Sequence, residues 1–296
     1  MKQQTSGYLY ALGAALALAS SFIFSKSSLN HISMLQFGAV WFSMGVVWNG
    51  IWYFGRKSHL RFRTNTKKRL SIAVLIAVLE GLATGLFYLA IKAMENPAVV
   101  SFIGNIGPVF VTIMGVFLLR ERFKGAQIAG ILVTIAGIFV INFRDGAFAG
   151  FIDPGAVFVM SASLLFALAT IAGRRYKQDL DPELMSLIRT LLLAVVFVIL
   201  IFISKENLDF QGFVWRDLAL GSLFETLLTI VFAYQALRRI EATSTSLIIS
   251  SKAVWTLLLA WIFLDVFPLP LQLIGGGLTL AGIYLITWRR KAGNQE

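Results

Sequence analysis

Cysteine is absent from this 296-residue chain, and only two histidines are present, His31 and His59. Without thiols, the chain can form no disulfide and offers no thiolate metal ligand or nucleophile. Charge is also scarce, because Asp, Glu, Lys and Arg together make up only 14% of the sequence. Soluble globular domains carry about 25% charged residues, so this composition excludes an ordinary soluble fold.

The chain is rich in apolar residues: 57% of it is hydrophobic, and the mean hydropathy is +0.78. They occur in runs long enough to cross a bilayer as helices. Because lipid offers no partner for backbone N–H and C=O groups, we expect these runs to be helical. The sequence predicts an all-α polytopic membrane protein with ten transmembrane helices, near residues 7–25, 33–53, 70–91, 97–119, 125–143, 154–173, 183–203, 217–237, 243–264 and 269–288.

The basic residues are unevenly distributed between the predicted loops. With the N-terminus in the cytoplasm, 19 Lys and Arg lie on the cytoplasmic side and five outside, namely Lys26, Lys92, Arg144, Lys205 and Arg216. The positive-inside rule therefore predicts a multi-pass protein of the inner (cytoplasmic) membrane with both termini cytoplasmic. A net charge of +11 would suggest nucleic acid as the partner of a soluble protein. Here we interpret it as a topology determinant beside anionic lipid, with no nucleic acid partner.

The two halves of the chain share a pattern at a spacing of 145 residues. The matching pairs are Glu80 and Glu225, Thr84 and Thr229, Phe87 and Phe232, Gln127 and Gln272, Gly130 and Gly275, and Gly137 and Gly282. We therefore expect two repeats of five helices each, at 1–146 and 147–296. Since five is odd, the repeats enter the membrane from opposite sides, which is the inverted arrangement of many secondary transporters. Either a monomer or a homodimer fits this unit.

Ionisable residues inside the predicted spans are the first candidates for function, because they are costly in hydrocarbon. Glu80, Glu225 and Lys252 fall near mid-membrane, whereas Arg189 lies close enough to a helix end to snorkel to the interface. Polar and aromatic residues lie near them on the same faces or on neighbouring helices. The predicted substrate- or ion-binding set is Ser21, Glu80, Thr84, Tyr88, Asn105, Glu225, Thr229, Tyr234, Lys252 and Trp255.

One lysine cannot neutralise two glutamates. Our hypothesis is that Glu225 pairs with Lys252, and that Glu80 is protonated at rest and couples transport to protons. The reverse assignment of the two glutamates is open. A fixed ion pair that only locks two helices together is the structural alternative. No metal or cofactor site is expected.

Several stretches resemble the drug/metabolite transporter superfamily, and specifically its ten-helix members built from two EamA repeats. They include Asn96-Pro97-Ala98, Gly107-Pro108-Val109-Phe110, Leu118-Leu119-Arg120-Glu121-Arg122-Phe123 and Gln127-Ile128-Ala129-Gly130. Lys252-Ala253-Val254 departs from the Glu-Pro-Val that is usual in the family. The resemblance implies a transporter, commonly an exporter of amino acids, metabolites or toxic compounds, with a central cavity between its halves.

The sequence thus predicts a secondary active transporter that exports a small amphipathic metabolite, amino acid or amine by alternating access. A membrane receptor or scaffold without transport is an alternative from another class. A polytopic membrane enzyme is a further one, but His31 and His59 lie on opposite sides of the membrane in the predicted topology, so they cannot form one site. We therefore expect no enzyme activity. A nucleotide-driven pump is excluded because the chain has no Gly-x-x-x-x-Gly-Lys-Ser/Thr loop.

Overall fold

The computed structural model describes residues 2–55, 66–95, 97–119, 125–141, 153–176, 182–240, 242–267 and 269–292, and all regular secondary structure in these ranges is helical. The elements are α1 (Lys2–Leu29), α2 (Met34–Gly55), α3 (Thr66–Ala93), α4 (Pro97–Gly104), α5 (Gly107–Leu119), α6 (Gly125–Ile141), α7 (Pro154–Arg175), α8 (Pro182–Ser204), α9 (Gly212–Ser222), the π-helix η3 (Leu223–Thr229), α10 (Ile230–Arg239), α11 (Ala242–Ile249), α12 (Lys252–Leu264) and α13 (Pro270–Ala292).

Each predicted span coincides with one helix or with consecutive short helices. Within the described residues, five helical stretches are long and apolar enough to cross a membrane. They are Gln4–Leu29, Leu70–Ala93, Pro154–Arg175, Glu183–Ser204 and Gly212–Arg239, the last of which comprises α9, η3 and α10. The structure is therefore that of a polytopic membrane protein, and ten crossings with cytoplasmic termini remain a prediction. The predicted boundary between the repeats, at residue 146, lies outside the described residues.

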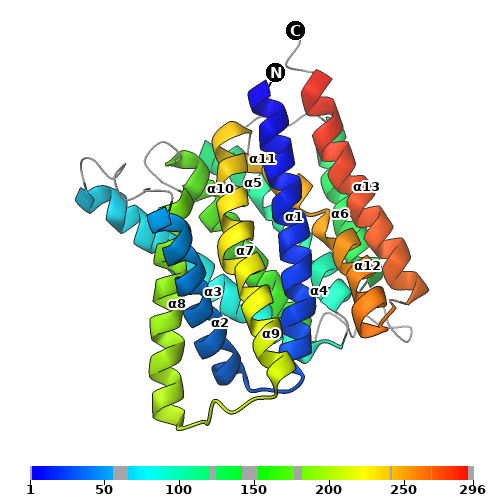
Figure 1. The fold of residues 1–296 in the computed structure, drawn as a ribbon. Helices are drawn as coiled ribbons and strands as arrows, with labels where there is room; N and C mark the ends of the chain where they lie inside the picture. Colours follow the sequence, from blue (N-terminus) through cyan, green and yellow to red (C-terminus); the bar gives the residue numbers. More distant parts are fainter. Residues whose placement is uncertain are drawn as a thin grey trace.

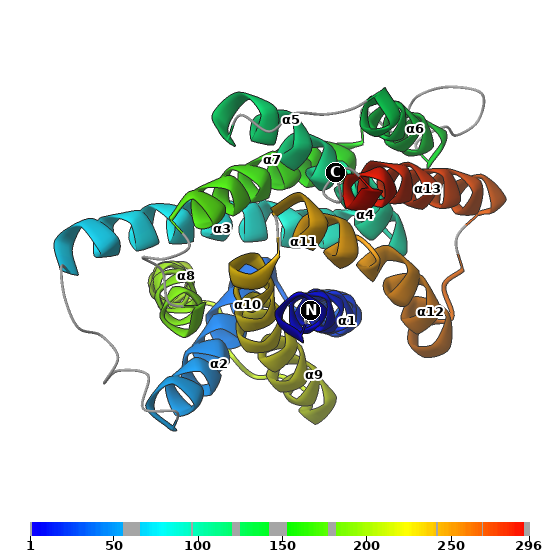
Figure 2. The same ribbon diagram turned by 90° about the horizontal axis from the view of Figure 1, so that it is seen from above.

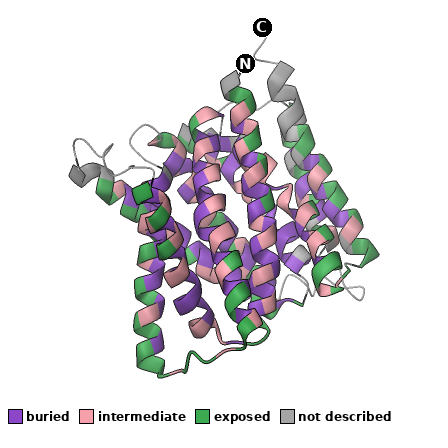
Figure 3. Ribbon diagram, viewed as in Figure 1, coloured by how far each residue is buried: buried purple, intermediate pink, exposed green. Residues whose placement is uncertain are grey.

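The helices are arranged as a bundle in which the beginning of α1 and the end of α13 lie at the same end (Figure 1). Seen along the bundle, α1, α2, α8, α9 and α10 lie on one side, and α5, α6 and α7 lie on the other (Figure 2). α3 packs against both α7 and α8, while α1 packs against α10 and α12, so helices of the first half contact those of the second throughout. Buried residues face the interior of this bundle, and exposed residues cover its outer helices (Figure 3).

The exposed surface is itself apolar. Phe117, Phe202 and Ile203 are 79%, 78% and 73% exposed, and many other large hydrophobic side chains also lie outward. A soluble monomer rarely exposes so large an apolar area. Lipid is the environment in which these side chains have no unfavourable contact with water.

The α6–α13 interface is reciprocal. A Cβ atom added to Gly137 would lie 2.6 Å from the carbonyl oxygen of Gly275, and one added to Gly282 would lie 2.6 Å from that of Gly130. The backbones therefore approach so closely that only glycine fits at these two places. Gly137 and Gly282 are 145 residues apart, as are Gly130 and Gly275, so each half makes the same contact with the other across this interface.

Two helix interruptions also occur at equivalent positions. α4 and α5 are separated by Asn105 and Ile106, and α11 and α12 are separated by Ser250 and Ser251, which are 145 residues further on. α4 packs against α12, and α5 packs against α11. Both interruptions are consequently in the interior of the bundle, where irregular backbone is tolerated in a membrane protein.

Candidate functional site

A cavity of about 190 Å³ lies between the two halves, with lining residues from α1, α3, α4, α5, α7, α8, η3, α10, α11 and α12. Its walls are mainly apolar and aromatic, and they include Leu18, Phe22 and Phe87. Seven residues of the predicted binding set line it, namely Glu80, Thr84, Tyr88, Glu225, Thr229, Tyr234 and Lys252. The pattern of intramembrane polar residues therefore points to a real hollow in the structure.

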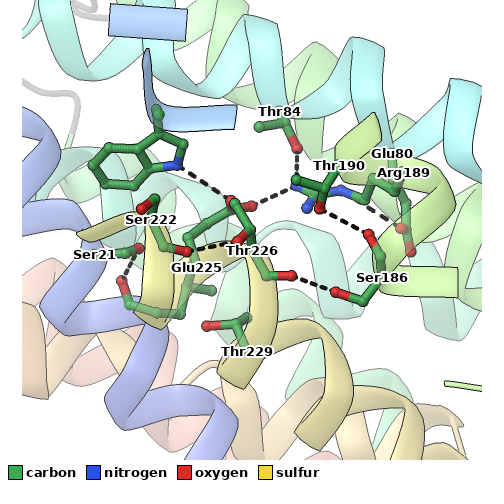
Figure 4. Close-up of polar contacts among 12 residues, drawn as sticks. Ser21, Glu80, Thr84, Ser186, Arg189, Thr190, Ser222, Glu225, Thr226 and Thr229 are labelled. Atoms are coloured by element: carbon green, nitrogen blue, oxygen red, sulfur yellow. Dashed lines mark hydrogen bonds and ion pairs between the residues drawn. The ribbon is translucent and has the colours of Figure 1, made fainter. Parts of the chain in front are cut away.

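The charged centre of this cavity is a buried group of three residues, Glu80, Arg189 and Glu225 (Figure 4). Arg189 Nη2 donates hydrogen bonds to Glu225 Oε1 and, at 2.6 Å, to Thr84 Oγ1. Arg189 Nε lies 3.6 Å from Glu80 Oε2. One guanidinium thus serves two carboxylates, and the group carries one negative charge in excess when all three residues are ionised.

The structure corrects the prediction that Arg189 snorkels to the interface. Its side chain is fully buried, because α8 directs it toward the two glutamates in the interior and away from the nearby helix end. The sequence contains a pattern that indicates this inward orientation, and our prediction did not use it. Ser186, Arg189 and Thr190 have the spacing of one helix face, and all three are fully buried. A polar face of this kind in a membrane helix must point inward.

Two aromatic side chains complete the contacts of the carboxylates. Tyr234 donates its hydroxyl hydrogen to Glu80 Oε1 at 2.9 Å, and Trp41 donates its indole N–H to Glu225 Oε2 at 3.4 Å. Sequence reasoning had selected Tyr234 but not Trp41, which is fully buried and comes from α2. Glu225 therefore has the shorter contact with Arg189, whereas Glu80 Oε2 has no hydrogen-bond partner among the described residues.

Glu225 belongs to the π-helix η3, which interrupts the α-helical course between α9 and α10. Thr229 donates its hydroxyl hydrogen to the carbonyl oxygen of Phe224, five residues earlier, at 2.9 Å. A π-helical turn changes the direction in which side chains leave the helix, and such turns are frequent at functional sites. Glu225 and Glu80 therefore differ in backbone setting, although they occupy equivalent positions in the sequence repeat.

Lys252 does not pair with Glu225, so the predicted ion pair is wrong. Among the described residues, no carboxylate lies within 4 Å of its ammonium group, because Arg189 contacts both glutamates. Lys252 Nζ lies instead over two aromatic rings, 5.3 Å from the centroid of Phe87 and 5.7 Å from that of Phe22. Both contacts are within the range of cation–π interactions.

Three predicted residues lie outside the cavity lining. Ser21 is fully buried and donates its hydroxyl hydrogen to the carbonyl oxygen of Leu18 at 2.8 Å. Asn105 is fully buried at the interruption between α4 and α5, where its amide has no hydrogen-bond partner among the described residues. Trp255 is half-buried on α12. Ser21 and Trp255 lie on helices that contribute other residues to the lining, and Asn105 lies between the lining residues Gly104 and Gly107.

The two ends of the bundle differ around the cavity. Near the end of α1, Lys26 donates hydrogen bonds to the carbonyl oxygens of Ile91 and Met94, at 3.2 Å and 2.7 Å, and so holds α1 against the end of α3. Ser27 donates to Asp217 at 2.6 Å and links α1 to α9. Toward the other end, the cavity lining continues to Leu237, Thr245 and Ser246. The hollow therefore extends toward the end of the bundle where α1 begins.

The sequence and the fold are similar to those of known proteins. The sequence profile of the EamA-like transporter family matches residues 5–143 and 153–288. The chain is 22% identical over 292 residues to the uncharacterized transporter YyaM of Bacillus subtilis, covering 93% of this chain and 92% of YyaM. It is 25% identical over 278 residues to an uncharacterized transporter of Archaeoglobus fulgidus, covering 92% and 94% of the two chains. A protein of known crystal structure has the same fold, with a TM-score of 0.73 over 99% of both chains at 18% identity.

Proposed function

This chain belongs to the EamA-like transporter family, and from that premise we propose that it is a secondary active transporter. It exports a small amphipathic metabolite, amino acid or amine across the inner membrane by alternating access, and proton movement drives the export. The observation that carries the proposal is the cavity, because it combines buried charge with aromatic walls between the two halves of the chain. Small-molecule sites typically have this mixture of apolar walls and a few polar groups.

Alternating access is supported by the matched features of the two halves. The interruptions of α4–α5 and α11–α12 are equivalent in the repeat, and α6 and α13 contact each other through equivalent glycines. An inverted repeat of this kind can adopt two related conformations, each open to one side. The close contact of Gly137 and Gly282 with the facing backbone would hold α6 and α13 together while the other helices move.

The unequal contacts of the two carboxylates support proton coupling at Glu80. Glu225 has the direct contact with Arg189, whereas Glu80 is 3.6 Å from Arg189 Nε and keeps one oxygen without a hydrogen-bond partner among the described residues. A single guanidinium balances one carboxylate, and the excess negative charge then falls on Glu80. Glu80 lines the cavity, so a proton can reach its carboxylate from the side to which the cavity opens.

The cavity extends toward the side from which an exporter takes its substrate. Its lining extends toward the end of the bundle that the positive-inside rule assigns to the cytoplasm, and the Lys26 and Ser27 contacts hold the helices together at the opposite end. A conformation open to the cytoplasm is the one that accepts a cytoplasmic substrate.

Transport by the purified protein tests the proposal. A thermal-shift screen of metabolites in detergent identifies ligands, and their uptake into proteoliposomes is then measured with and without an imposed pH gradient. We expect gradient-driven uptake in the wild type, and we expect Glu80→Gln to lose its dependence on the gradient while it still exchanges substrate.

The control is Asp209→Asn, which neutralises an exposed carboxylate in the connection between α8 and α9 and should leave flux unchanged. Full gradient-driven flux in both Glu80→Gln and Glu225→Gln would rule out the proton-coupling part. Ligand binding without any flux in proteoliposomes would rule out transport and favour a receptor.

A further inference from the structure

Lys252 lines the cavity, and its ammonium group has no ion-pair partner among the described residues. No carboxylate of the described residues lies within 4 Å of it, and its recorded contacts are with the rings of Phe22 and Phe87. An unpaired lysine inside a membrane helix is unfavourable. Its presence beside a cavity therefore suggests that an anionic group binds there.

The backbone groups next to Lys252 are already engaged in hydrogen bonds, so they do not bind an anionic ligand in its place. The amide N–H groups of Ala253 and Val254 donate to the carbonyl oxygens of Ser250 and Ser251, at 3.2 Å and 3.0 Å. The hydroxyl of Thr256 donates to the Lys252 carbonyl oxygen at 2.8 Å. The amides of Ala253 and Val254 are thus already bonded, whereas the ammonium of Lys252 is free to donate to a ligand.

The charge is also unique to the second half of the chain. Lys252 is the first residue of α12, and its equivalent at the start of α5 is Gly107, which also lines the cavity. The two carboxylates, by contrast, are matched in the two halves. The cavity therefore has a positive group on the α12 side only, separate from the group formed by Glu80, Arg189 and Glu225.

We propose that Lys252 is the anion subsite of the cavity and binds the carboxylate of a small amphipathic substrate. The apolar part of the substrate packs against Phe22, Phe87 and Phe166, which line the same cavity. The inference rests on the proposed function, because it names the substrate class of that site. It narrows the substrate to organic carboxylates, with or without an amino group, because a simple amine has no anionic group for the Lys252 ammonium to bind.

The volume agrees with a ligand of this kind. The cavity measures about 190 Å³, below the roughly 300–1,000 Å³ typical of sites for drug-sized ligands. A single ring or a short branched chain with one carboxylate is in keeping with such a space.

Three probes with the same apolar part and different charge test the proposal. They are 3-phenylpropionate, phenethylamine and phenylalanine, which present a carboxylate, an ammonium and both groups respectively. Binding of each to the full-length protein in detergent is measured by thermal shift and calorimetry, in the wild type, Lys252→Met and Lys252→Arg. Lys252→Met removes the charge at similar volume, whereas Lys252→Arg retains it.

We expect both carboxylate probes to raise the melting temperature of the wild type and of Lys252→Arg, and phenethylamine to have no effect. In Lys252→Met the dissociation constant of both carboxylates should increase about tenfold or more, because one charge-assisted hydrogen bond is lost. The melting temperature of this variant without ligand shows that it is folded.

Stronger binding of phenethylamine than of 3-phenylpropionate, unchanged carboxylate binding in Lys252→Met, or no binding of any probe would overturn the inference. These results are distinguishable from failure of the proposed function. Transport that does not depend on Lys252 leaves the transporter intact and removes the subsite, whereas carboxylate binding without flux in proteoliposomes keeps the subsite and removes transport.

Discussion

Replacing Arg189 with Met removes the one cation that faces two buried carboxylates, and this change tests the charge arrangement of the cavity. Arg189 is fully buried and contacts Glu225 directly, Glu80 at 3.6 Å and Thr84 at 2.6 Å. Removing one partner of a buried ion pair typically destabilises a protein by about 3–5 kcal/mol, because the remaining charge stays buried without compensation. With two carboxylates left, we expect Arg189→Met to lower the free energy of unfolding by at least this amount.

The glutamate variants should have unequal effects. Glu80→Gln removes the excess negative charge and can still accept the Tyr234 hydrogen bond, so we expect stability within about 1 kcal/mol of the wild type. Glu225→Gln removes the direct partner of Arg189 and should be destabilising by about 1.5–3 kcal/mol, the usual contribution of a hydrogen bond to a charged group. The triple variant Arg189→Met, Glu80→Gln and Glu225→Gln should recover most of the loss, because replacing a whole buried charged set is often nearly neutral.

Reversible unfolding in mixed detergent micelles, followed by the helical circular dichroism signal, measures these free energies. A loss below about 1 kcal/mol for Arg189→Met would show that water reaches the group and compensates the carboxylates. Equal losses for Glu80→Gln and Glu225→Gln would contradict the unequal contacts. Failure of the triple variant to recover would mean that packing of the arginine stem, and not its charge, is what stabilises the site.

Three further changes give separate tests. Gly137→Ala places a Cβ 2.6 Å from facing backbone, so it should destabilise the protein by about 1–3 kcal/mol in the same unfolding assay, whereas Gly85→Ala, with open space around it, should not. Tyr234→Phe should lower the free energy of unfolding by about 1.5–3 kcal/mol through loss of its hydrogen bond to the Glu80 carboxylate. An unchanged free energy of unfolding would show that water donates to this carboxylate in place of Tyr234. Because the chain has no cysteine, Ser246→Cys should react with a membrane-impermeant maleimide from the cytoplasmic side and Lys92→Cys from the outside; labelling from the opposite sides would reverse the predicted topology.

Much of the fold follows from the sequence, because a bilayer leaves an apolar run of about 20 residues few alternatives to a helix. The helices and the residue types of the cavity were accessible for that reason. The interruption at Asn105 was accessible as well, because Pro108 cannot donate a hydrogen bond to the carbonyl oxygen of Gly104. The interruption at Ser250 was not, since neither Ser250 nor Ser251 forbids a helix and tertiary packing decides whether the helix continues. The π-helical turn at Glu225 was hidden in the same way, because its sequence is compatible with an ordinary α-helix.

The positions of the charged residues along their helices did not predict which of these residues form ion pairs. Depth along a helix placed Glu225 and Lys252 both near mid-membrane and Arg189 closer to an end. Side chains of this length can contact groups more than one turn away, however, and helix rotation decides which of them meet. α8 turns Arg189 inward, and the arginine then occupies the contacts that the lysine would have made.

The two carboxylates are equivalent in the repeat, but the cation between them is not. The position of Arg189 in the second half corresponds by the 145-residue spacing to Met44, so a single guanidinium must serve two symmetric sites. In the present conformation it contacts Glu225 directly and Glu80 at a longer distance. If the halves exchange conformations, we expect the preference of Arg189 to move toward Glu80, because the two carboxylates occupy matched positions. Neutralising one carboxylate should then favour the conformation in which Arg189 pairs with the other.

This exchange is measurable through the accessibility of a cysteine at Ser246. Glu225→Gln should slow its labelling from the cytoplasmic side, because the variant favours the conformation closed to that side. Glu80→Gln should leave labelling as fast or make it faster, because Arg189 keeps its contact with Glu225. Parallel changes in both variants would show that the guanidinium does not move between the carboxylates, and that the two glutamates act only as a fixed negative pair.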